Sequence, residues 1–360
     1  MTSTTTTSPI ISTAPLSFRW PVIDPFIMVV HHVDRFPAGN GRLGPATQEG
    51  NLGDDMAAMG NGWHMYYGSD VPGFPAHPHR GFETVTFVRQ GLVDHADSFG
   101  ASGRYGRGDV QWLTAGGGIQ HSEMFPLVDT EGENTLELFQ IWLNLPASDK
   151  TTDPHFTMSW AEDIPHLVTT DDAGRSTEVT VVAGAPLGVS APTPPPASWA
   201  ARPDAGVAIW HIRLDAHAEW TLPRADTPDV RRMLYVIEGD TLRIADAELT
   251  NRVAVYVDPT VDVPITAGAK PVSMLLLQGR PIGEPVVAHG PFVMNTRKEI
   301  LDAYTDFRAT EFGGWPWPDS APNHGPDSGR FARYPDGNVS VPPTGTGAAR
   351  RDDEVTPTSA

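Results

Sequence analysis

The stretch His77-Pro-His-Arg-Gly-Phe-Glu-Thr-Val-Thr-Phe87 contains two histidines separated by one residue, followed by a run typical of a β-strand. His121 and Glu123 repeat this spacing of metal-ligand residue types further along the chain. Side chains at positions i and i+2 share one face of a strand, about 7 Å apart, so each pair can point at one place. One such pair alone could be two polar residues in a loop, but two pairs favour a shared site. Three imidazoles and a carboxylate suit Fe²⁺, Mn²⁺, Ni²⁺, Cu²⁺ or Zn²⁺.

Glu83 is a second candidate for the carboxylate ligand. Strand alternation would place it on the same face as His79 and, with Val85 and Phe87, toward the interior of a barrel. Glu83 could instead hold an imidazole in position by a hydrogen bond, or be a polar group of the core. Of the two acidic residues we favour Glu123 as the ligand.

The other histidines are weaker candidates. His31 and His32 are adjacent, so on a strand they would point in opposite directions. His95 is expected to order a turn by hydrogen bonds. We find no phosphate-binding loop, no dinucleotide-binding glycine pattern and no Gly-x-Ser-x-Gly nucleophile elbow.

Composition excludes several classes of protein. The formal net charge of -19 opposes direct binding to nucleic acid or to anionic lipid surfaces. The absence of cysteine excludes disulfides, thiolate ligands and a cysteine nucleophile. No apolar run approaches the roughly 20 residues of a membrane span, and the N-terminus does not resemble a secretory signal. We expect a cytoplasmic protein.

The distribution of strand-like runs predicts an all-β fold of two antiparallel barrels. The chain contains 35 glycines and 35 prolines, which favour short strands joined by turns over long helices. The run Thr84–Gly91 resembles the later run Met233–Gly239, which indicates a duplicated barrel. Strands are expected at 26–30, 83–88, 109–114 and 136–145 in the first half, and at 178–183, 207–214, 233–237, 253–257 and 272–277 in the second.

These patterns divide the chain into four parts. We expect a disordered tail over residues 1–15, a metal-binding barrel over 16–147, a second barrel over 148–312, and a largely irregular or disordered extension over 313–360. One helix is expected near residues 296–307, because Thr296 and Glu299 form a candidate capping box before an apolar periodicity.

The two histidine segments resemble the signature of the pirins, a branch of the cupin superfamily. The matching segments are His77–Phe87 and Gly108-Asp-Val-Gln-Trp-Leu-Thr-Ala-Gly-Gly-Gly-Ile-Gln-His-Ser-Glu-Met124, extended by 139–146 and 290–296. The resemblance covers roughly residues 20 to 312. It implies a bicupin, with two jelly-roll barrels face to face and a metal in the N-terminal barrel only. Iron would be held by the residues that match the family's ligands, His77, His79, His121 and Glu123.

Two functions follow from the resemblance. The first is a quercetinase, a dioxygenase that cleaves a flavonol with O₂, in which Glu123 would also be the catalytic residue that accepts the flavonol proton. The second is an iron-dependent, redox-sensing regulator that docks on a transcription factor or a metabolic enzyme. We favour the enzyme, with Fe²⁺ as the cofactor, and expect a monomer because the two barrels pair with each other.

Overall fold

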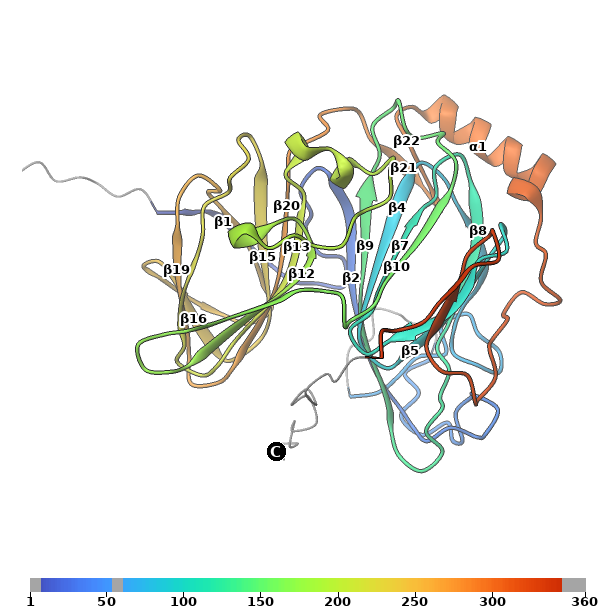
Figure 1. The fold of residues 1–360 in the computed structure, drawn as a ribbon, viewed down its shortest axis with the longest axis horizontal. Helices are drawn as coiled ribbons and strands as arrows, with labels where there is room; N and C mark the ends of the chain where they lie inside the picture. The colour runs from blue at the N-terminus through green and yellow to red at the C-terminus, as the bar shows by residue number, and fades with distance from the viewer. Residues whose placement is uncertain (1–7, 54–60, 345–360) are drawn as a thin grey trace, which may run out of the picture.

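The computed structural model describes residues 8–53 and 61–344. Two barrels of antiparallel strands lie side by side (Figure 1), which confirms the predicted all-β architecture. Among the described residues there is one α-helix, α1 (Arg297–Thr310), and there are four short 3-10 helices: η1 (Pro186–Gly188), η2 (Trp199–Ala201), η3 (Pro203–Ala205) and η4 (Glu311–Gly313). None of the described helices combines the length and apolarity that crossing a membrane requires.

Two sheets form the first barrel. One sheet has the order β10 (His155–Ser159), β7 (Val110–Thr114), β4 (Phe82–Gln90), β9 (Asn134–Asn144) and β2 (Phe26–Phe36). The other has the order β24 (Val339–Ser340), β23 (Phe331–Arg333), β6 (Ser102–Gly106), β5 (Leu92–Asp97), β8 (Ile119–Met124) and β3 (Gly73–His79).

Two further sheets form the second barrel. The larger has the order β1 (Ile10–Pro15), β18 (Val253–Val257), β15 (Arg231–Glu238), β20 (Val272–Gly279), β13 (Ala208–Leu214), β12 (Ser176–Ala183) and β11 (His166–Thr170). The smaller has the order β14 (Glu219–Leu222), β19 (Val263–Ala267), β16 (Thr241–Ile244) and β17 (Ala247–Thr250), and a separate hairpin joins β21 (Val287–His289) to β22 (Phe292–Met294).

The two barrels repeat one strand order. The series β7-β4-β9-β2 of the first barrel corresponds to β18-β15-β20-β13 of the second, and β3-β8-β5-β6 corresponds to β14-β19-β16-β17. Even an irregularity recurs: β4 has a bulge between Val88 and Gln90, and β15 has one between Val236 and Glu238. The bulges align the two strands residue by residue: Val88 corresponds to Val236, and four residues earlier Thr84 corresponds to Arg232. The duplication predicted from the sequence is confirmed.

An apolar core holds the barrels together. Residues of the five-stranded sheet, such as Phe87 and Phe139, pack with residues of the seven-stranded sheet, such as Ile209 and Leu275. Each barrel has a second core of its own. The two large sheets therefore face each other, and the strands that carry the histidines lie on the far side of the first barrel (Figure 1).

The structure corrects the predicted ends of the domains. Residues 10–15 are not a disordered tail, because they form β1 and pair with β18 of the second barrel. The first barrel extends past residue 147, because β10 pairs with β7. The extension after residue 312 contributes β23, which pairs with β6 of the first barrel. Residues 1–7 and 345–360 of the predicted tails lie outside the described residues.

The predicted helix is confirmed as α1. The Thr296 side chain accepts a hydrogen bond from the backbone of Glu299, whose carboxylate accepts one from the Thr296 backbone in return. This reciprocal cap satisfies N–H groups that the first turn leaves without partners. The helix packs Ile300 and Ala303 on a small apolar cluster that includes Phe292.

Candidate metal centre

Three histidines meet inside the first barrel. His77 and His79 lie on β3 and His121 lies on the neighbouring strand β8, with His77 directly opposite His121 in the pairing. One ring nitrogen from each lies within 4.8 Å of the others, and the centroids of the rings are 4.4 to 5.0 Å apart. The sequence predicted that these three side chains would converge, and the structure brings them together.

Hydrogen bonds fix the protonation of two imidazoles. The Nδ1–H of His77 donates to the Pro75 carbonyl at 2.9 Å, and the Nδ1–H of His79 donates to the Pro291 carbonyl at 3.3 Å. A carbonyl can only accept, so in each neutral ring Nε2 keeps a free lone pair. This is the tautomer that a metal ligand needs, held by the kind of outer contact usual at metal sites. Pro291 precedes β22, so the second half of the chain helps to orient the histidine pair.

His121 has no hydrogen-bond partner in the described structure. It is completely buried, and both its Nδ1 and its Nε2 lack a partner. Burial and the neighbouring imidazoles hold the pKa values of His121 and His79 well below the usual range, and burial lowers that of His77 to about 4. All three rings are therefore neutral at pH 7. A buried polar ring without partners is costly unless a ligand satisfies it, which a metal ion would do.

Glu123 lies beside this cluster. Its carboxylate is 3.8 Å from Nε2 of His121, although the group of atoms within 4.8 Å contains only the three histidines. The hydroxyl of Thr86 lies 3.2 Å from the Glu123 carboxylate and 2.8 Å from the Gln140 side-chain oxygen. Burial raises the pKa of Glu123 to about 7. In the metal-free protein, this carboxyl can thus take up or release a proton near neutral pH.

Glu83 points away from the histidines, so its predicted place beside His79 is wrong. Arg80 and Gly81 separate β3 from β4, and Gly81 has a φ of 86°, which breaks the alternation between the two residues. Glu83 accepts hydrogen bonds from the hydroxyls of Thr114 and Ser198, at 2.7 and 2.5 Å. Burial raises its pKa to about 7.

The same break reverses the predicted faces of the strand that follows. Val85 and Phe87 belong to the core between the barrels rather than to the interior of the first barrel. The interior face carries Phe82, which packs on His79 with ring centroids 5.0 Å apart, and Thr86, which reaches Glu123.

His95 is closer to the site than the sequence suggested. It is completely buried on β5, opposite Glu123, and its ring centroid is 5.6 Å from that of His121. Its Nε2–H donates to the Asp97 carboxylate at 3.2 Å, which leaves Nδ1 buried without a partner. Asp97, not His95, orders the following turn by accepting from the backbone of Phe99 and Ala101. Alternation from Val93 could have placed His95 in the interior.

Aromatic side chains line one side of the cluster. Phe74 lies 6.3 Å from His77 between ring centroids, and Tyr66 and Phe125 pack around Phe74. His31 and His32 point apart, as predicted: His31 stacks on Phe139, whereas the Nδ1–H of His32 donates to the Tyr66 hydroxyl at 2.9 Å. Tyr66 and Phe74 are partly buried, and their rings give the site an aromatic border.

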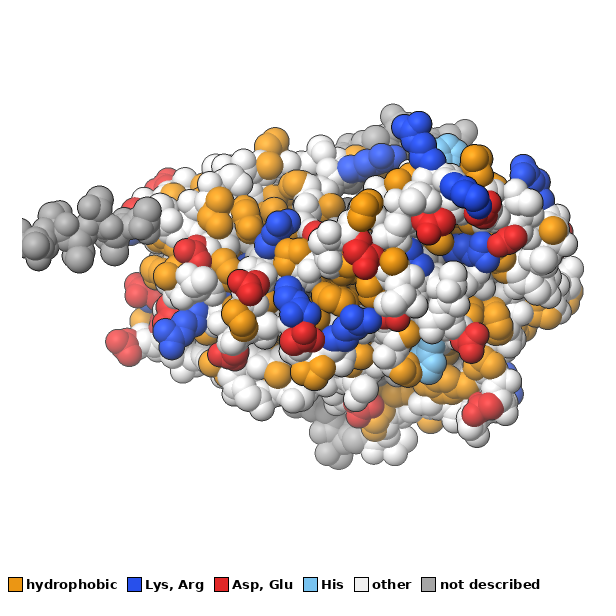
Figure 2. All heavy atoms as spheres, turned by 90° about the horizontal axis from the view of Figure 1, so that it is seen from above, with side chains coloured by type: hydrophobic (Ala, Val, Ile, Leu, Met, Phe, Trp, Pro, Cys, Tyr) orange, Lys and Arg blue, Asp and Glu red, His pale blue; other side chains and the backbone are white. Residues whose placement is uncertain are grey.

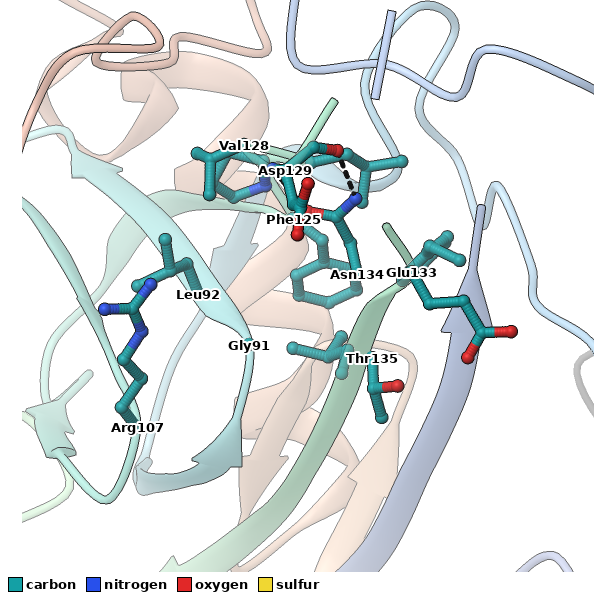
Figure 3. A pocket seen from close by; sticks show the side chains of 13 residues that line it. Gly91, Leu92, Arg107, Phe125, Val128, Asp129, Glu133, Asn134 and Thr135 are labelled. Carbon is teal, nitrogen blue, oxygen red and sulfur yellow. Dashed lines mark hydrogen bonds between the residues drawn. The ribbon is translucent and has the colours of Figure 1, made fainter. Parts of the chain in front are cut away.

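Three sizeable cavities lie elsewhere in the described chain. One of about 190 Å³ is bordered by Gly91, Leu92, Phe125 and residues 126–129 and 133–136 (Figure 3), where Asn134 and Asp129 are hydrogen-bonded to each other. The others have volumes of about 530 and 500 Å³. None of the three is lined by His77, His79, His121 or Glu123.

The repeated strand order and the placement of the histidines define a bicupin. Two family models match the chain: Pirin over residues 47–143, and the Pirin C-terminal cupin domain over residues 209–313. The chain belongs to the pirin family.

Relatives and solved structures agree with this assignment. A Pseudomonas aeruginosa protein with the provisional name quercetin 2,3-dioxygenase is 38% identical over 67% of this chain and 79% of its own length. A pirin-like protein of Solanum lycopersicum is 36% identical over 68% of this chain and 78% of its own. The crystal structure of quercetin 2,3-dioxygenase from Acinetobacter baumannii matches with a TM-score of 0.66 and 25% identity, covering 85% of this chain and 98% of that one.

Proposed function

We propose that this protein binds one divalent metal ion through His77, His79, His121 and Glu123, with Fe²⁺ as the favoured metal. The observation that carries the proposal is the convergence of three neutral imidazoles, one of which has no partner for either nitrogen among the described residues. Desolvation keeps the rings unprotonated, and two of them already present Nε2. The donor set accepts Mn²⁺, Ni²⁺, Cu²⁺ or Zn²⁺ as well. Glu123 completes the set because its carboxylate is adjacent to His121.

We further propose that the metal site cleaves flavonol-type substrates with O₂. The support is the set of relatives and structures with quercetin 2,3-dioxygenase names. A bound metal would supply Lewis acidity and a template for the substrate oxygens. The partly buried ring of Phe74, with Tyr66 beside it, would contact the flat substrate.

Glu123 is the residue that handles a proton in this proposal. Its carboxylate lies 3.8 Å from Nε2 of His121, beside the proposed metal site, and there it can accept the proton of the flavonol hydroxyl. Thr86 has a single hydroxyl proton, which it can donate either to the Glu123 carboxylate or to the Gln140 side-chain oxygen, and in the first case it orients the carboxylate.

A regulatory role is the second candidate. None of the three cavities described above is lined by the histidines, so none of them provides a substrate space at the cluster. Acidic and basic side chains are interspersed on the face shown in Figure 2, which suits a protein partner better than nucleic acid. In this case the charge of the bound metal would alter the electrostatics of a surface that binds a protein partner, and no substrate would be converted.

One experiment separates the two candidates. Protein purified without oxygen and reloaded with Fe²⁺ is mixed with quercetin, and both quercetin loss and O₂ uptake are followed beside the variant His121→Ala. Turnover that is absent from the variant supports the dioxygenase. No turnover with a full equivalent of bound iron favours the regulatory function, and a His121→Ala variant that keeps its iron contradicts the ligand set.

A further inference from the structure

The second barrel has a cavity of about 500 Å³ at one end. Ala208 and Trp210 of β13 line it and also belong to the apolar core of that barrel. Arg232 of β15 and Gln278 of β20 stand in register with Ala208, so all three project from the same face of the sheet into the barrel end. The cavity therefore meets the barrel interior directly.

Arg232 is a buried cation to which no carboxylate of the described residues is hydrogen-bonded. It is 1% exposed, and its Nε–H and Nη2–H groups donate to the Gln278 side-chain oxygen at 2.8 and 2.5 Å. An Nη1–H donates to the Pro223 carbonyl at 2.6 Å. These bonds use three of the five guanidinium N–H groups, and every acceptor is neutral. Burying an arginine on neutral acceptors is costly, which calls for an explanation.

The charge of the lining favours an anion. Arg202, Arg224 and Arg232 line the cavity, against one acidic residue, Asp226. Arg202 also pairs with Asp149 at 2.6 Å, so its charge is shared. Asp226 and Asp262 act electrostatically on Arg232, but neither accepts a hydrogen bond from it among the described residues.

The remaining walls are apolar. Trp210 supplies an indole ring, and a proline-rich loop supplies most of the other side chains. Leu187 on this loop is 66% exposed. The apolar lining residues are Pro186, Leu187, Pro192, Pro194 and Trp210.

The duplication relates the position of Arg232 to a position beside the metal centre. Arg232 corresponds to Thr84 of the first barrel, whose cross-strand partner Trp142 packs on His79 with ring centroids 5.3 Å apart. Pro223, which accepts from Arg232, directly follows β14, the counterpart of the strand with the two histidines. Arg232 thus occupies the place in the second barrel that borders the metal centre in the first.

We propose that this cavity is a binding site for a carboxylate with an aromatic body. The planar guanidinium of Arg232 matches a carboxylate in two parallel hydrogen bonds, while Trp210 and the prolines cover the ring. The single buried guanidinium and the apolar walls fit a carboxylate better than a multiply charged phosphate. The site does not depend on the metal centre.

Calorimetric titration with 2-naphthoate tests the proposal, with the neutral 2-naphthamide as the comparison ligand. The full chain is used, both unchanged and with His121→Ala, which removes the metal site as a place of binding. We expect one equivalent of naphthoate to bind to both proteins and the amide to bind at least about tenfold more weakly, because it lacks the charge-assisted bonds. Arg232→Met should weaken naphthoate binding to the same degree.

A matched pair of surface variants guards against misfolding of Arg232→Met. Leu187 on the cavity wall and Leu301 on α1 are both 66% exposed. Leu187→Glu should weaken naphthoate binding at least about tenfold by placing a negative charge in the cavity, and Leu301→Glu should leave it unchanged. Equal binding of the amide, loss of binding in His121→Ala, or wild-type binding by Leu187→Glu would each overturn the proposal.

Discussion

The two barrels share a strand order but differ in what they bury. On β3 and β8 of the first barrel the inner positions carry His77, His79 and His121. On the corresponding β14 and β19 of the second barrel, the apolar core takes Leu222, Val263 and Ile265. The same strand order can therefore carry either a polar cluster or an apolar core, depending on a few inward-facing side chains.

The difference extends to unsatisfied polar atoms. Buried side-chain nitrogens and oxygens without a partner among the described residues include Thr84 Oγ1, His95 Nδ1, Gln111 Nε2 and both ring nitrogens of His121. All of these belong to the first barrel, and Asn295 Oδ1 is the one such atom in the second half of the described chain. Each such group costs folding free energy while it has no partner, so these atoms lower the stability of the metal-free first barrel.

The largest expected effect is the loss of metal from His121→Ala. Removing one of three converging imidazoles should lower metal affinity by more than about 100-fold. Metal analysis after dialysis measures this. His155→Ala is a suitable control because His155 is exposed on β10. A stoichiometric metal content in His121→Ala would show that the first barrel does not hold the ion through this cluster.

The second largest effect is expected from substituting the two buried glutamates, Glu123 and Glu83, which should change quercetin turnover to different degrees. Glu123→Gln removes the proposed proton acceptor, and quercetin turnover should fall by about 100-fold or more. Glu83 lies on the other side of the sheet from the histidines. Glu83→Gln should therefore keep turnover within about twofold of the wild type. Steady-state rates of the two iron-loaded variants make the comparison. The opposite order would move the carboxylate role to Glu83.

Ile265→Ala is expected to separate stability from metal binding. Ile265 is completely buried in the second barrel, and the cavity should cost about 2–5 kcal/mol of unfolding free energy. Urea unfolding measures this cost, while the metal content of the folded variant should stay at that of the wild type. A variant that lost its metal while still folded would contradict the division of labour between the barrels.

The smallest effect is the pH dependence that Glu83 imparts. Its pKa is raised from 4.5 to about 7, so the folded chain binds the proton more tightly than the unfolded chain does. The favourable contribution is complete below pH 4.5 and is lost as the pH rises through 7. Compared with the wild type, Glu83→Gln should gain about 1–3 kcal/mol between pH 5 and pH 8. Thermal unfolding of both metal-free proteins tests this, and parallel pH profiles would contradict it.

The sequence predicted the convergence of the histidines because alternation within a single strand is reliable. It failed for Glu83, since two residues between strands change the face and nothing in the strand pattern reveals this. The resemblance indicated the family, but not where the chain ends would pair. The ends misled because Thr- and Pro-rich composition says little about a segment that completes a sheet edge.

The pairing of the two ends has a consequence for attempts to divide the molecule. β1, near the start of the chain, completes a sheet of the second barrel, whereas β23, near its end, joins a sheet of the first. No single cut between the barrels yields two fragments that each keep all of their strands. A fragment of either half would expose an unpaired strand edge and be prone to associate with other chains. The two barrels repeat one strand order, but each can be completed only in an uncut chain.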